Sequence, residues 1–322
     1  MFQFGGRMDG LKFQQLIAML GELNEDQRQT VAAIISSHGD LAEVTSVIEA
    51  RFATQVLCLH CQSTNVGSWG RACGLKRYRC RECRKSFNAL TGTPLARLHK
   101  RGAWKTYAQA VTESVSVRKA AQRTGVSVPT AFRWRHRFLT LAKDAQAKAV
   151  SGIVEADETF FLRSFKGART MSRAPRKRGG PASKRGASDE HVPVLVLRAR
   201  SGATADAVLE SLKVAEIYRV LTPVVARDKD TVIVSDGARA YASFAFEAGI
   251  GHVGLTGRRG ERRRGVFHIQ NVNAYQSRLK TWMRRFNGVA TKYLPNYLGW
   301  RRMFEREGDT ISPQRCLLAA LA

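Results

Sequence analysis

Two pairs of cysteines constrain the fold of this chain most. Cys58 and Cys61 form one CxxC pair, Cys80 and Cys83 form another, and eighteen residues separate the pairs. A CxxC pair suits a turn in which two thiolates approach one ion, and four thiolates complete a closed tetrahedral zinc site. A closed site leaves no position for a reacting water, so we expect the Zn²⁺ to be structural. The spacing predicts a zinc ribbon over residues 51–98.

The charge of the chain favours nucleic acid as its partner. Its 322 residues carry 53 Lys and Arg against 26 Asp and Glu, a formal net charge of +27. Such an excess neutralises phosphates. A membrane surface is the rival partner, but no run of about 18 apolar residues occurs and the start lacks a signal-peptide pattern. With only six cysteines, a disulfide scaffold is excluded, and we expect a cytoplasmic protein without membrane contact.

The length is sufficient for several domains. The sequence predicts a helical segment of unassigned role at 1–50, the ribbon at 51–98 and a helix-turn-helix segment at 99–148. An α/β catalytic domain at 149–305 and a tail at 306–322 follow. A loop rich in Lys, Arg, Gly, Ser and Pro, residues 163–190, is inserted in the fourth. This loop is either a solvated linker or an arm that follows DNA.

The segment from Ser116 to Leu139 has the pattern of a helix-turn-helix. Gly125 permits the sharp turn, and Ser127 caps the helix that follows. The stripe expected to be buried consists of Val126, Ala131, Trp134 and Phe138. The side chains left for the DNA groove and phosphates are Thr130, Arg133, Arg135 and Arg137. A three-helix bundle without DNA contact shares this pattern, but the position between two basic segments favours DNA binding.

Strands and helices alternate after residue 148. The sequence predicts strands at 151–161, 192–198, 231–236 and 251–255, and helices at 241–248 and 269–286. Residues 204–221 indicate a helix or a strand and helix. Asp157 lies near the end of the first predicted strand and Asp236 at the end of the third. Two carboxylates brought together in this way suit Mg²⁺ ions about 4 Å apart, which aid attack on a phosphodiester.

The helix predicted at 269–286 supplies the third element of such a site. Asn273 and Lys280 are seven residues apart and therefore share a face with Ser277 and Arg284. The opposite face is apolar, with Val272, Tyr275, Leu279, Met283 and Phe286. One face is expected to pack on the sheet, and the other to meet solvent or substrate. The order of elements resembles a ribonuclease-H-like fold, an α/β mixed sheet with flanking helices.

Four segments carry a more specific resemblance: YRCRECRKSFNALTGTPLA in the ribbon, ADETF, SDGARAY, and HIQNVNAYQSRLKTWMRRFNGVATKYLPNYLGWRRM. They resemble the ISXO-like group of bacterial insertion-sequence transposases over roughly residues 50–305. The resemblance implies a recombinase of the DDE superfamily with catalytic Mg²⁺ or Mn²⁺. Its metal-binding triad maps to Asp157, Asp236 and Asn273, where Asn stands in place of the usual Glu and is the weaker ligand.

The same resemblance implies that Lys280 holds a DNA phosphate and that Arg284 lies on the DNA-binding face. His268 is either a further ligand or proton carrier, or a structural residue at the start of the helix. The expected activity is cleavage of double-stranded DNA at the terminal inverted repeats and transfer of the freed strand into target DNA. Synapsis of two ends implies a homodimer or larger assembly.

Two other functions fit the same residues. A DNA-binding regulator, or a decayed transposase, would use the ribbon and helix-turn-helix and cleave nothing. A structure-specific nuclease would cut DNA without joining strands.

Overall fold

A computed structural model describes residues 9–171, 174, 180–184, 188–256 and 260–321. Its internal contacts divide the chain into two units, Met1–Gly92 with Ala96–Tyr107, and Thr93–Leu95 with Ala108–Ala322. The helix α3 (Trp104–Thr112) crosses the boundary between them.

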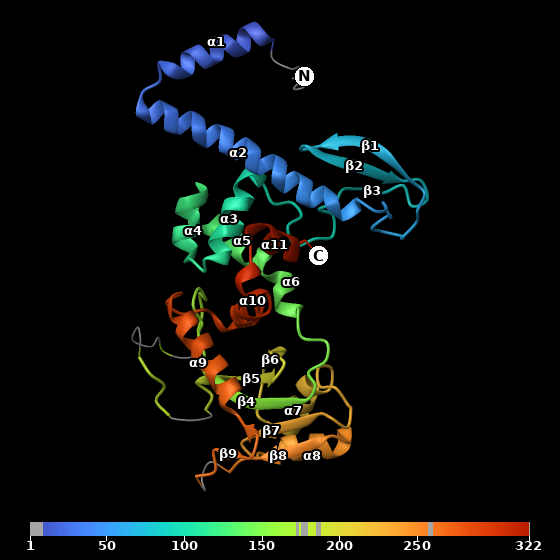
Figure 1. Ribbon diagram of the computed structural model, residues 1–322, viewed down its shortest axis with the longest axis vertical. Coiled ribbons are helices and arrows are strands. Elements are labelled where there is room, and N and C mark those ends of the chain that lie inside the picture. Colours follow the sequence, from blue (N-terminus) through green and yellow to red (C-terminus); the bar gives the residue numbers. More distant parts are fainter. Residues whose placement is uncertain (1–8, 172–173, 175–179, 185–187, 257–259, 322) are drawn as a thin grey trace. The chain divides into compact units, whose positions relative to one another are not determined.

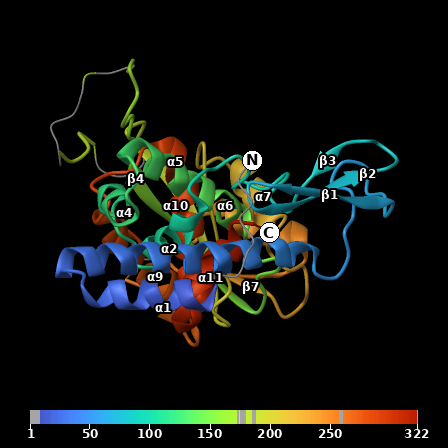
Figure 2. The same cartoon turned by 90° about the horizontal axis from the view of Figure 1, so that it is seen from above.

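The first unit contains two helices and a small sheet. The helices are α1 (Gly10–Gly21) and α2 (Glu25–Glu49), and Asn24 begins α2 in a capping box with Gln27. The strands β1 (Val66–Ala72), β2 (Leu75–Cys80) and β3 (Ser86–Phe87) pair antiparallel in that order. Figures 1 and 2 show the three strands side by side.

The second unit is organised on a five-stranded mixed sheet with the order β6-β5-β4-β7-β8 (Figure 1). The strands β4 (Ile153–Leu162), β5 (His191–Ala199) and β6 (Thr204–Val208) are paired antiparallel, β4 with β5 and β5 with β6. The strands β7 (Val232–Ser235) and β8 (Gly251–Gly254) continue the sheet parallel to β4. Residues 204–221 form strand β6 and helix α7, so the second of the two predicted alternatives for this segment is correct.

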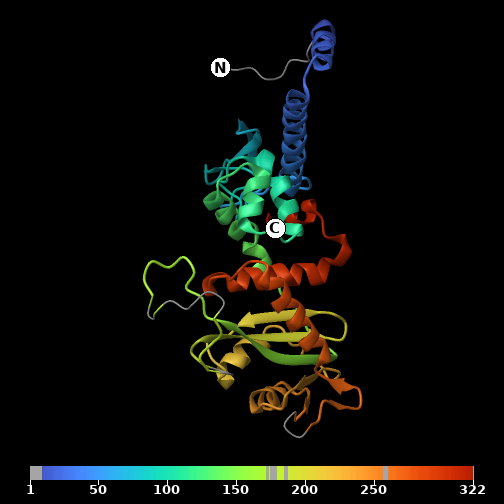
Figure 3. The same ribbon diagram turned by 90° about the vertical axis from the view of Figure 1, so that its left-hand side faces the viewer.

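Helices cover both faces of the sheet. Val154 and Ala156 of β4 belong to a core with residues of α7 (Val214–Leu221) and α8 (Arg239–Ala248). Side chains alternate along a strand, so Glu155 and Asp157 point to the other face. There α9 (Gln270–Arg284) packs on β4 and β5, and Figure 3 shows this helix beside the sheet.

Further helices precede and follow the sheet in the chain. They are α4 (Val117–Thr124), α5 (Val128–Phe138), α6 (Thr140–Asp144), α10 (Leu294–Glu307) and α11 (Pro313–Ala319). Gly125 ends α4 with a left-handed φ of 62°, and the Ser127 side chain caps α5. The stripe predicted to be buried, Val126, Ala131, Trp134 and Phe138, is buried.

The structure bears on three predictions, which concern the C-terminal tail, the basic loop and membrane-spanning helices. The C-terminal segment expected as a tail contains α11, which packs on α5 through its buried residues Cys316 and Leu317. The described residues of the basic loop 163–190 form no helix or strand, whereas 172–173, 175–179 and 185–187 lie outside the described residues. Among the described residues, no helix is both long and apolar enough to cross a membrane.

Gly299 permits the close approach of α10 to α6. A Cβ at this position would collide with the carbonyl group of Ala142 and come within 2.6 Å of the Lys143 amide nitrogen. Both are backbone atoms and cannot rotate away, so the approach requires the absence of a side chain.

We expect Gly299→Ala to destabilise the second unit by about 1–3 kcal/mol or more, because it overpacks a backbone contact. The free energy of unfolding measured in urea checks this. The matched control is Gly39→Ala in α2, where nothing lies within 4 Å of the added Cβ. Equal stability of the two variants would contradict the close approach.

Candidate active site and nucleic-acid interface

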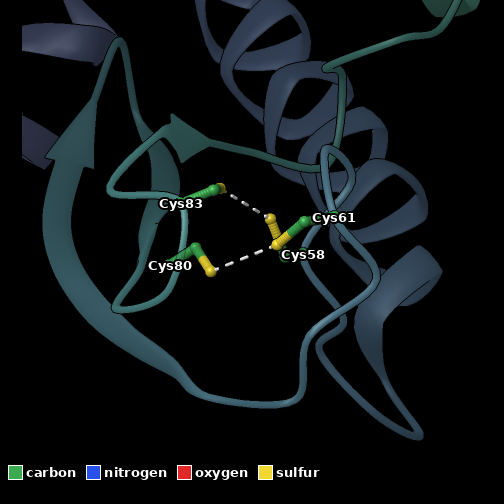
Figure 4. Close-up of side chains that lie close together, drawn as sticks. All are labelled: Cys58, Cys61, Cys80 and Cys83. Carbon is green, nitrogen blue, oxygen red and sulfur yellow. Dashed lines mark hydrogen bonds between the residues drawn. The ribbon is translucent and has the colours of Figure 1, made fainter.

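The four paired cysteines gather at one point of the first unit. Their sulfur atoms all lie within 4.8 Å of one another, and the Cys58–Cys83 and Cys61–Cys80 pairs are 3.6 Å apart (Figure 4). Four thiolates at the Zn–S bond length would stand about 3.8 Å apart on a tetrahedron. The cluster therefore fits a zinc ion, as the spacing predicts.

Local backbone geometry aims the thiols at one another. The residue after each CxxC pair, Gln62 and Arg84, has a left-handed φ of 62° and 58°. The Gln62 amide also donates to the Cys58 carbonyl at 2.9 Å, which closes the first turn. Beside the cluster, the rings of Phe52, Tyr78 and Phe87 pack with centroids 5.5–5.9 Å apart. This apolar core is small, so we expect a ribbon with zinc bound at the cluster to depend on the metal for its stability.

Removal of zinc with a chelator is expected to unfold the ribbon, and Cys80→Ser to lower the bound zinc from one ion per chain. Zinc content by mass spectrometry and thermal unfolding check both. Cys73→Ser is the control, since Cys73 is exposed and outside the cluster. Full zinc content in the Cys80 variant would refute the site.

The sheet brings Asp157 and Asp236 together. Parallel pairing joins Glu155 of β4 to Val234 of β7, and two residues further along each strand stand Asp157 and Asp236. Asp157 lies in the middle of β4, not near its end as predicted, because β4 continues to Leu162 paired with β5. The parallel pairing of β4 with β7, by contrast, ends at Glu155, before Asp157 is reached.

The electrostatics of Asp157 are consistent with this proximity. Burial is the main influence and raises the pKa of its carboxyl group, and the charge of Asp236 raises it further. The Gln276 amide and the charge of Lys280 act in the opposite direction but do not outweigh burial. The structure therefore places two predicted acids and the predicted lysine within electrostatic reach of one another.

Helix α9 is held on β4 by a buried carboxylate that the sequence analysis did not identify. Glu155 is fully buried, and its Oε2 accepts the N–H groups of Asn271 and Val272 at 2.7 and 2.9 Å. These amides belong to the first turn of α9, where no helical partner exists. The Asn271 amide side chain and the Arg200 guanidinium satisfy the other oxygen at 2.8 and 2.9 Å.

One helical turn of α9 matches two residues of β4. Four residues of helix rise about 6 Å and two residues of strand about 6.6 Å. Val272 lies at Glu155, and Gln276 accordingly lies at Asp157, where its Nε2 donates to Oδ2 at 3.1 Å. The helix contact with Asp157 therefore comes from Gln276, a residue that the sequence analysis missed.

Asn273 and Lys280 flank Gln276 on the outward side of α9. Both are exposed, at positions three before and four after it, so the three share one strip of the helix. Among the described residues, no hydrogen bond of the Asn273 side chain is found. Arg284 is exposed and lies one turn beyond Lys280. The same spacing that selected Asn273 and Lys280 in the sequence could have indicated Gln276.

Two further residues lie beside the site. Tyr241 donates its hydroxyl hydrogen to Glu158, and burial raises the pKa of Glu158, as do the charges of Asp157 and Asp236. His268 accepts the Gln270 N–H on its Nδ1 at 3.2 Å. Because this contact lies at the first residue of α9, it is consistent with the structural role that is one of the two predicted for His268.

Among the predicted DNA contacts, Arg135 is wrong. It is fully buried, its Nη2 donates to the Val115 carbonyl at 2.8 Å, and its guanidinium lies 4.6 Å from the centre of the Trp300 ring. Because α10 covers this side of α5, the cation packs on aromatic rings instead of facing solvent.

The other helix-turn-helix contacts stay predictions. Arg133 and Arg137 are exposed on α5. Thr130 is half-buried in the first turn of α5, with its hydroxyl 2.9 Å from that of Ser127.

We expect Glu155→Gln to lower the free energy of unfolding by about 1–3 kcal/mol, because the Arg200 guanidinium and two helix amides lose their buried carboxylate. Urea unfolding and hydrogen exchange at Asn271 and Val272 would detect it. Glu210→Gln, at an exposed acid, is the control. Unchanged exchange at both amides would show that Glu155 does not hold α9.

Known proteins are similar to the part of the chain that contains this site. A sequence profile of the ISXO2-like transposase domain matches residues 149–301. The chain is also 27% identical over 270 residues to an uncharacterized protein in the transposable element ISH50 of Halobacterium salinarum, covering 81% of this chain and 90% of that protein.

Two solved structures align with the chain at 12% identity. One is the Mos1 transposase paired-end complex with the left transposon end, which covers 67% of this chain and 78% of its own with a TM-score of 0.22. The other is a pre-cleavage Mos1 transpososome, which covers 68% and 79% with a TM-score of 0.19.

Proposed function

Because the chain belongs to the ISXO2-like insertion-sequence transposases through residues 149–301, we propose that it cleaves DNA at the ends of its element and joins the freed strands to target DNA. The observation that carries this proposal is the position of Asp157 and Asp236, each two residues beyond the parallel pair Glu155–Val234 of β4 and β7. Asp236 and Lys280 also lie within electrostatic reach of Asp157. Phosphoryl transfer on DNA needs such a pair of acids beside a phosphate-binding cation.

The topology of the second unit supports a ribonuclease-H-like core. Three antiparallel strands are followed by two parallel ones, in the order β6-β5-β4-β7-β8. The first acid stands on the central strand β4, and the second follows the neighbouring strand β7. A later helix, α9, packs on β4 and β5, in keeping with the order of elements in the sequence.

The residues fit a divalent cation. Burial and the neighbouring Asp236 make ionisation of Asp157 unfavourable, and a cation between the two carboxylates would relieve that cost. Asp157, Asp236 and Asn273 would hold Mg²⁺ or Mn²⁺, ions that accept carboxylate and amide oxygens. Bound there, the metal would assist the attacking oxygen and stabilise the leaving one.

The chain's own side chains would orient the acids and the DNA. The Gln276 amide fixes one oxygen of Asp157 at 3.1 Å and leaves the other available. Lys280 would attract a phosphate as a point charge, and Arg284 would extend this contact one turn further along α9. Each of these groups acts by position and charge, and none forms a covalent bond to the DNA.

DNA recognition would lie with the helix-turn-helix and the ribbon. Thr130, Arg133 and Arg137 would contact the terminal inverted repeats, with α5 as the recognition helix. The zinc ion would keep the ribbon folded. Because two ends must be cut and joined together, the working form would be a homodimer or larger assembly on DNA.

Asp157→Ala and Asp236→Ala are each expected to reduce Mg²⁺-dependent cleavage of terminal-repeat DNA by roughly a thousandfold, since several kcal/mol of transition-state stabilisation are lost. Gel assays of strand cleavage and of strand transfer measure this. Asp230→Ala, at an exposed acid in the loop before β7, should cleave at the wild-type rate.

Three results would overturn the proposal. Undiminished cleavage by both aspartate variants would refute the site. Cleavage without strand transfer would indicate a nuclease. Specific DNA binding without cleavage in either metal would indicate a regulator.

A further inference from the structure

Next to the proposed catalytic strip, α9 and α10 line a basic pocket of about 290 Å³ that is largely open to solvent. Its lining residues are Ser277, Arg278, Thr281, Trp282, Arg285 and Arg301. Five of them come from successive turns of α9 and form one stripe of that helix. The pocket is thus lined by three guanidinium groups, two hydroxyl groups and one indole ring.

The pocket is electropositive in spite of a neighbouring acid. Glu305 is in contact with three guanidinium groups: Arg278 and Arg198 at 3.4 and 3.2 Å, and Arg301 one turn before it in α10. Burial tends to raise the pKa of Glu305, but these three cations outweigh it and the pKa is lowered. One carboxylate is thus shared among three cations. Arg285 is exposed and has no acidic partner among the described residues.

Much of the pocket is held in place before any ligand binds. Glu305 fixes the Arg301 guanidinium, whose side chain is 16% exposed. The Trp282 indole donates to the Ser114 hydroxyl at 2.9 Å, and its ring packs edge-on against Trp300 at 5.0 Å. A ligand would therefore order mainly Arg285 and Arg278, so little side-chain entropy is lost.

We propose that this pocket binds a backbone phosphate of the DNA that the catalytic site acts on. Guanidinium forks and hydroxyl donors match phosphate oxygens, and the exposed Arg278 and Arg285 leave the pocket accessible to a long polymer. Ser277 and Thr281 directly follow Gln276 and Lys280 and lie about 100° around the helix from them, and Arg285 lies about 140° around from Lys280. The pocket therefore occupies the side of α9 that adjoins the catalytic strip. The inference rests on the proposed function, because it supposes that DNA lies along α9.

The test uses the full-length chain with Asp157→Ala, so that DNA stays intact, and a duplex carrying the terminal repeat. Arg285→Ala is the main variant, because Arg285 has no acidic partner among the described residues that the substitution would remove. We expect its dissociation constant to rise about tenfold and the slope of log K against log salt to fall by about one, the loss of one phosphate contact. Arg285→Lys should recover part of the affinity.

Arg227→Ala is the matched control, since Arg227 is an exposed arginine in the loop between α7 and β7. It should leave the slope unchanged. A series of duplexes, each with one neutral methylphosphonate, locates the phosphate. A methylphosphonate at one position should weaken duplex binding when the pocket is intact. The same methylphosphonate should not weaken binding further in the Arg285→Ala variant.

Each failure has a distinct signature. An unchanged slope, or methylphosphonate effects that add to the substitution, overturns the pocket while DNA binding itself persists. If inorganic phosphate alone binds the pocket and the duplex affinity is unaltered in Arg285→Ala, the pocket is a free-anion site. This result also overturns the proposal. Absence of duplex binding by the parent protein refutes the proposed function instead. Thermal unfolding of every variant separates lost contacts from lost folding.

Discussion

The second unit depends on one buried carboxylate, Glu155, which joins the sheet to the helix that faces it. An ionised acid without solvent is costly unless donors surround it. Here two amides of the first turn of α9, one side-chain amide and Arg200 surround it. The positive end of the helix dipole adds to this stabilisation. Since β4 also carries Asp157, the interaction that docks α9 sets the register of this helix on the strand of the proposed catalytic acid.

Buried cations hold the surrounding helices in a comparable way. Arg302 of α10 is paired with Asp206 of β6, and its guanidinium also donates to the backbone carbonyl of Lys143 at 2.7 Å. It thereby satisfies the C-terminal end of α6 and ties that end to the sheet. Arg135 of α5 likewise donates to a backbone carbonyl, that of Val115 before α4, and packs on Trp300 of α10. Two buried cations of this chain therefore join helices to one another instead of facing solvent.

The sequence predicted those parts of the structure that depend on local pattern. The CxxC spacing indicated the cysteine cluster, alternation and apolar runs indicated the strands, and helical spacing indicated α9. Glu155, Gln276 and Arg135 could not be placed in this way. A charged or amide residue looks solvent-exposed in any local pattern, and only the packing of α9 and α10, distant in the chain, buries these three. Arg135 is one residue from the buried Trp134, so whether it faces DNA or core depends on α10.

The neutral residues of α9 have a consequence for the charge of the site. The acids of the proposed metal site are Asp157 and Asp236, because α9 contributes only the amides Asn273 and Gln276. Glu155 lies on the same face but is bonded to the backbone of α9, and Glu158 points to the other face and is bonded to Tyr241. A third acid on α9 would raise the pKa of Asp157 further, and burial already raises it. An amide in the proposed third ligand position avoids that further rise, at the cost of a weaker ligand. Under the proposed function, the exposed cations Lys280 and Arg284 of α9 would contribute to holding the DNA.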